Sequence, residues 1–135
     1  MGRSNARLDG IGEPFLAALS EVGIKNRELL LNRAKDRRGR RQLATETGIS
    51  EALILHWVNT ADLMRIRGVG HDYCELLRAT GVDTVRDLRH RNASNLAAAL
   101  QEVNARQRLV REAPGEKRVA SWIAQAKLLP TVITH

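Results

Sequence analysis

A glycine pair in the middle of the chain is the feature most suited to binding chemistry. Gly68-Val69-Gly70 follows an apolar helix end, and a new helix is predicted to begin at once. Two glycines one residue apart allow a tight hairpin. The N–H groups of the next helix then stay free at its N-terminus, where the helix dipole favours an anion. We therefore expect Gly68, Val69, Gly70 and His71 to contact a phosphate group.

The same element occurs earlier in the chain as Gly10-Ile11-Gly12, 58 positions upstream. Further along, ILHWVNTADL (54–63) matches VASWIAQAKL (119–128) at an offset of 65 positions. An internal repeat of this kind determines the architecture. We expect repeats over residues 8–63 and 64–130, with a flexible tail at 1–7 and a short tail at 131–135. Because each repeat is small, we also expect the two to share one core.

Composition narrows the class of partner. The 135 residues carry a net charge of +7, and 43% are hydrophobic, which is enough for a folded core. The charge favours nucleic acid over a membrane surface or an acidic protein, although a merely soluble basic protein is the alternative. The chain has one cysteine and no apolar run typical of a signal peptide or a membrane span. We expect a cytoplasmic protein with no membrane partner.

Helical periodicity dominates, and strand signals are nearly absent. The sequence therefore predicts an all-α fold. Several helix ends carry local signals: Asn26, Ser50 and Asn92 or Ser94 as N-caps, Thr84 with Asp87 as a capping box, and Gly23 and Gly81 as stops.

A basic run provides a second candidate surface. Arg33–Arg41 holds six Lys or Arg residues and one acid, and Gly39 interrupts it, so we place a loop or the start of a helix there. Arginine suits phosphate because its planar guanidinium donates two parallel hydrogen bonds. The residues expected to contact phosphate are Arg38, Arg40, Arg41, Arg86 and Arg89. The alternative is a solvated basic loop.

Other chemistry has less support. Leu43–Asn59 has the pattern of a helix-turn-helix with Gly48 at the turn, but its second helix is too apolar to read base edges, so we interpret it as core. The four histidines show no metal-ligand spacing with Cys74 or the acids. We interpret Cys74 as a packing residue. The sequence predicts no enzyme, no metal and no cofactor.

The repeated element resembles the helix-hairpin-helix (HhH) motif, in which an apolar residue follows the second glycine by about seven positions. Leu77 and Leu19 stand at those positions. The resemblance implies paired motifs that bind the backbone of duplex or branched DNA without reading sequence, as in RuvA, NAD-dependent DNA ligase and DNA polymerase beta. It also implies that hairpin carbonyls can hold a monovalent cation.

Over nearly its whole length the chain resembles a bacterial family of unknown function with tandem HhH repeats. The marks of that family are the segments GRRQLATETGIS, ILHWVNTADLMRIRGVG and WIAQAKLLP. The expected fold is two HhH-containing repeats packed as one pseudo-symmetric, all-α domain. The expected function is non-enzymatic binding of DNA.

Two acids depart from the DNA-binding pattern. Glu13 and Asp72 follow the hairpins, where DNA-binding motifs tend to place small, polar or basic residues. A carboxylate there can satisfy the amides that a phosphate would use. This argues against phosphate binding, more strongly for the first hairpin. The rival reading is a protein–protein adaptor, in which these acids cap their own helices and the basic face meets an acidic protein.

Overall fold

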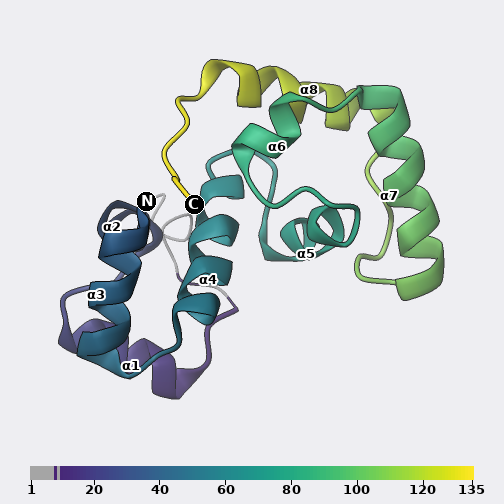
Figure 1. The fold of residues 1–135 in the computed structure, drawn as a ribbon. Coiled ribbons are helices and arrows are strands. Elements are labelled where there is room, and N and C mark those ends of the chain that lie inside the picture. The colour runs from purple at the N-terminus through teal and green to yellow at the C-terminus, as the bar shows by residue number, and fades with distance from the viewer. Residues whose placement is uncertain (1–7, 9) are drawn as a thin grey trace. The chain divides into compact units, whose positions relative to one another are not determined.

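The computed structural model describes residue 8 and residues 10–135 (Figure 1). Within that part of the chain the secondary structure is helical, with no strand, so the prediction of an all-α fold is confirmed. The helices are α1 (Glu13–Glu21), α2 (Arg27–Arg33), α3 (Arg37–Thr47), α4 (Glu51–Leu63), α5 (His71–Ala79), α6 (Val85–Arg89), α7 (Ala93–Gln107) and α8 (Glu116–Leu128). The tail predicted at 1–7 lies outside the described residues.

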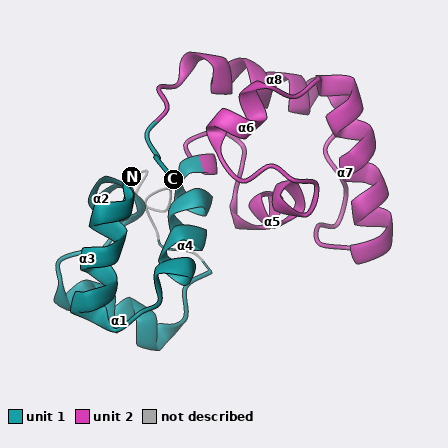
Figure 2. Ribbon diagram, viewed as in Figure 1, with its two compact units in different colours: residues 1–62, 132–135 teal, residues 63–131 magenta. Residues whose placement is uncertain are grey.

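The chain divides into two compact units, which Figure 2 shows in different colours. Unit 1 comprises residues 1–62 and 132–135, and unit 2 comprises residues 63–131. The buried apolar residues form two separate clusters, one in each unit. The single shared core expected from the small size of the repeats is therefore wrong: each unit buries a core of its own.

Local signals end the helices as predicted. α1 and α5 are followed by Gly23 and Gly81, both with positive φ. In unit 2 the N–H groups of Gly81 and Val82 donate to the carbonyls of Arg78 and Leu77. This pair of bonds is a Schellman motif, which satisfies carbonyls that the helix leaves open. α6 begins with the predicted capping box of Thr84 and Asp87.

The N-caps are also made by side chains close in sequence to the amides that they cap. The side chain of Asn26 accepts a hydrogen bond from the Leu29 N–H, and that of Asn92 accepts one from Asn95. Asp36 caps α3 by accepting from the Gly39 N–H at 2.7 Å. The basic run is therefore helical from Arg37 onward rather than an extended loop.

The last residues of the chain belong to unit 1. Ile133 is only 4% exposed and lies in the core cluster of that unit. The Thr134 N–H donates to the carbonyl of Lys35 at 2.8 Å. Residues 132–135 are thus a packed part of unit 1, whereas the sequence predicted a short tail for 131–135.

Candidate nucleic-acid interface

The glycine hairpin of unit 2 leads directly into α5. Gly68 has a φ of +97°, a conformation that side chains with a Cβ rarely adopt. Between the exposed Gly68 and Gly70, the side chain of Val69 is buried in the unit 2 core. The Val69 N–H donates to the carbonyl of Ile66, which closes the turn before the hairpin. The hairpin is therefore anchored by one buried side chain and presents its glycines outward.

Two residues of α8 hold this hairpin. Gln125 accepts a hydrogen bond from the Arg67 N–H at 2.7 Å and donates one to the Arg67 carbonyl at 3.2 Å. A Cβ atom at Gly68 would lie 3.3 Å from Nε1 of Trp122, so the indole packs against the bend. Sequence reasoning missed Gln125, since no local pattern links it to a residue 58 positions away.

The N-terminus of α5 has no side-chain cap. Gly70 occupies the N-cap position, and the first helical bond runs from the Cys74 N–H to the Gly70 carbonyl. The Asp72 side chain is 81% exposed and lies 3.5 Å from Nδ1 of the half-buried His71. Among the described residues, no main-chain N–H donates to it. The Asp72 carboxylate therefore does not cap these amides, because it turns toward the imidazole and solvent, but its charge still lies in the first turn of α5, where the helix dipole favours it.

The first hairpin offers fewer donors. Gly10 has a φ of +85°, Ile11 is buried and Gly12 is the exposed N-cap of α1. Pro14 stands in the first turn and has no N–H. The Phe15 N–H already donates to the Gly12 carbonyl. The N-terminus of α1 is thus poorer in donors than that of α5.

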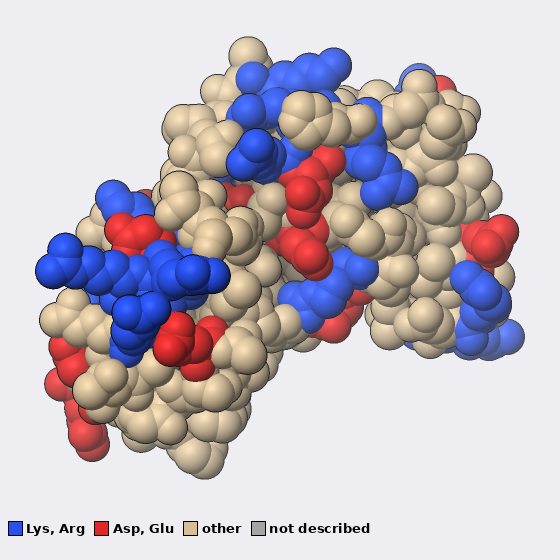
Figure 3. Space-filling model, viewed as in Figure 1, with Lys and Arg blue, Asp and Glu red and all other residues tan. Residues whose placement is uncertain are grey.

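Arg38 and Arg41 lie on one exposed face of α3. With Gln42, Thr45 and Glu46 they line a shallow hollow of about 600 Å³. Figure 3 shows basic side chains gathered over this part of unit 1. Glu46 is also the partner of Arg33, at 2.7 Å. Two of the predicted arginines are therefore brought together on one surface.

Arg40 has a different place. It is only 4% exposed; its guanidinium donates to the carbonyl of Ala34 at 3.0 Å and to that of Thr134 at 2.7 Å. Burial lowers the pKa of this guanidinium from its ordinary value, an effect that nearby Asp36 opposes. The prediction that Arg40 faces phosphate is corrected, because its donors hold the C-terminal segment onto unit 1.

The two arginines predicted in unit 2 also differ from each other. Arg89 donates to the carbonyls of Ala126 and Leu129 and to Oγ1 of Thr131. A cation at the C-terminus of α8 is favoured by the helix dipole, so Arg89 acts as a cap. Arg86 is exposed. Of the two, only Arg86 stays in the candidate interface.

The helix-turn-helix pattern is part of the core, as interpreted from the sequence. Ile54, Trp57 and Val58 of α4 are buried in the unit 1 cluster. Cys74 is likewise buried in the unit 2 cluster. The packing interpretations of the apolar helix and of Cys74 are both confirmed.

Within residue 8 and residues 10–135, no set of three or more His, Cys, Asp or Glu side chains is grouped closely enough to ligate a metal ion. No helix in the same part of the chain has both the length and the apolar character needed to cross a bilayer.

The fold and the hairpins define a class of protein: an all-α protein of two compact units, each with a glycine bend directly before a helix. The chain belongs to the family described as Domain of unknown function (DUF4332), whose profile matches residues 9–129. Comparison with curated proteins and with solved structures gave no match.

Proposed function

We propose that this protein binds DNA through its backbone, without reading its sequence. The observation that carries the proposal is the open N-terminus of α5, where Gly70 is an exposed N-cap with no side-chain cap. Free N–H groups and the positive end of the helix dipole together favour a phosphate oxygen. A Cβ atom at Gly70 would meet no atom within 4 Å, so a ligand has room to approach the main chain closely.

We further propose that the two units are HhH repeats. In support, Phe15 packs on Trp57 and Tyr73 packs on Trp122 with the same centroid separation of 5.2 Å and nearly equal interplanar angles of 60° and 59°. These pairs are related by the sequence offsets of 58 and 65. We propose that each repeat combines one glycine bend with one packed aromatic pair.

Exposed arginines in each unit supply further contacts. Arg38 and Arg41 of unit 1 and Arg86 of unit 2 are exposed and are proposed to contact phosphates. Such contacts position a protein on DNA and make its affinity depend steeply on salt. In the adaptor alternative Glu13 and Asp72 cap their own helices, and among the described residues neither accepts a hydrogen bond from a main-chain N–H.

The proposal predicts a steep dependence of DNA affinity on salt. Fluorescence anisotropy with a labelled duplex, repeated from low to moderate salt, should give a slope of about −0.9 per phosphate contact. Arg38→Gln and Arg41→Gln should each reduce the slope by about 1. Arg106→Gln, an exposed arginine in α7, is the control and should change it little. No binding at low salt to linear, nicked or four-way DNA would reject the proposal.

A second prediction distinguishes phosphate binding by the hairpin from binding that depends only on the positive charge of the protein. Gly70→Asp gives α5 an N-cap carboxylate, because Gly70 already has the extended backbone of an N-cap. The substitution should raise the free energy of unfolding by about 0.5–1 kcal/mol. It should weaken DNA binding by roughly tenfold, since the carboxylate occupies the amides and repels phosphate.

Gly12→Asp is the matched control for this variant. It adds the same charge at the N-cap of α1, where Pro14 has no N–H and the Phe15 N–H already has an acceptor. We expect it to affect DNA affinity less than Gly70→Asp does. Equal losses of affinity in the two variants would mean that the added charge, and not the hairpin of unit 2, is responsible.

A further inference from the structure

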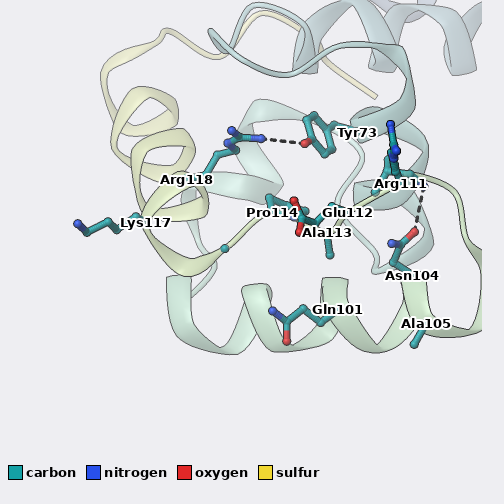
Figure 4. A pocket seen from close by; sticks show the side chains of 12 residues that line it. Tyr73, Gln101, Asn104, Ala105, Arg111, Glu112, Ala113, Pro114, Lys117 and Arg118 are labelled. Carbon is teal, nitrogen blue, oxygen red and sulfur yellow. Dashed lines mark hydrogen bonds between the residues drawn. The ribbon is translucent and has the colours of Figure 1, made fainter.

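A second candidate site lies within unit 2, in a pocket of about 790 Å³ (Figure 4). Its walls come from the end of α7, the segment 110–115, the start of α8 and Tyr73 of α5. Pockets of roughly 300–1,000 Å³ are typical of sites for small organic ligands. The pocket therefore has room for a molecule of nucleotide size.

Arg118 is fixed at this pocket by Tyr73. Its guanidinium donates to the Tyr73 hydroxyl at 2.8 Å and lies 6.0 Å from the centre of that ring. Figure 4 shows the side chain directed toward Tyr73. Because the hydroxyl oxygen accepts this bond, its own proton remains available for a ligand. The corresponding residues in unit 1, by the sequence offsets, are Phe15 and Leu53, whose side chains have no hydrogen-bond donor.

The polar groups of the pocket are mainly donors. The oxygen of Asn104 accepts the Val110 N–H, so its amide nitrogen is left to donate. Arg111, Lys117 and Arg118 are cations without acceptor atoms, and Glu112 is the one acid among the lining residues. Donors in excess, with a net positive charge, match a ligand rich in anionic oxygens.

We propose that this pocket binds the phosphate of a nucleotide. A phosphate offers acceptor oxygens to which Arg118, the Tyr73 hydroxyl and Arg111 can donate, and it pairs with guanidinium in a fork geometry. Ala105, Val110 and Pro114 give the walls apolar surface for the organic part. The bound phosphate can belong to a free mononucleotide or to the 5′ end of a DNA strand. Only the second possibility depends on the proposed DNA binding.

The test uses the full chain and thymidine 5′-monophosphate, with thymidine as the unphosphorylated control. In titrations followed by ¹⁵N–¹H NMR, the nucleotide should shift the Arg118 Nε and Gly115 amide signals, and thymidine should not. Arg118→Gln should weaken binding about tenfold, as expected for loss of a charged hydrogen bond. Arg111→Gln is a second variant at an exposed position, and Lys127→Gln, exposed on α8 outside the pocket, is the control.

The outcomes are distinct. Binding that needs the phosphate, and that Arg118→Gln or Arg111→Gln weakens more than Lys127→Gln, supports the site. No binding at millimolar nucleotide, equal binding of thymidine, or equal effects of all three variants overturns it. If a 5′-phosphate on an overhang raises the affinity for DNA and Arg118→Gln removes the gain, the source is a strand end. Nucleotide binding that is unchanged in Gly70→Asp while duplex binding is weakened separates this site from the hairpin.

Discussion

Arg40→Met should lower the free energy of unfolding by about 2–4 kcal/mol, because it leaves two carbonyl acceptors without their donor. The carbonyls belong to Ala34 and Thr134, and the guanidinium that serves them is buried. Methionine keeps much of the apolar stem but cannot donate a hydrogen bond. The loss should also release residues 132–135, which carry the buried Ile133. Urea unfolding followed by circular dichroism measures the change.

Arg41→Met is the matched control for Arg40→Met. Arg41 is the next residue on the same helix, but its side chain is exposed on the basic face of α3. Its replacement should change stability by less than about 0.5 kcal/mol. It should lower the salt slope of DNA binding instead. If the two variants were equally stable, the assignment of Arg40 as a structural residue would fail.

Gly39→Ala should destabilise the protein by roughly 2–3 kcal/mol, as expected for overpacking of a close contact. A loss of stability is unusual for this substitution, because replacing glycine by alanine inside a helix normally raises the free energy of unfolding by about 1 kcal/mol. A Cβ atom at Gly39 would lie 2.2 Å from the carbonyl oxygen of Arg33 and 3.1 Å from Oδ1 of Asp36. Since the nearer atom is main chain, the end of α2 or the start of α3 must move.

Gly12→Ala is the control for Gly39→Ala. A Cβ atom at Gly12 would meet side-chain atoms only at 3.9 Å, an ordinary contact distance. Its backbone has a φ of −68°, which any residue adopts. Thermal unfolding should therefore show a much smaller loss of stability for Gly12→Ala than for Gly39→Ala. A stabilised Gly39→Ala variant would contradict the close approach of α2 and α3.

The amino-acid sequence alone determined the features that depend on neighbours within a few positions. The sequence therefore predicts the all-α class, the glycine bends before α1 and α5, and the caps at Asn26 and Thr84. Each is decided by backbone freedom or by a side chain that reaches an N–H three residues away. The apolar character of α4 likewise identifies it as part of the core from the sequence alone.

Only the tertiary structure decided which arginines face solvent. Arg40 binds a carbonyl 94 positions away, and Arg89 binds one 40 positions away, so no local pattern distinguishes them from Arg41 or Arg86. The same applies to Gln125 beneath the hairpin and to the Arg118–Tyr73 pair. The physical reason is that a guanidinium binds a carbonyl or a phosphate with the same donors. The packing of distant segments therefore determines which acceptor each arginine meets.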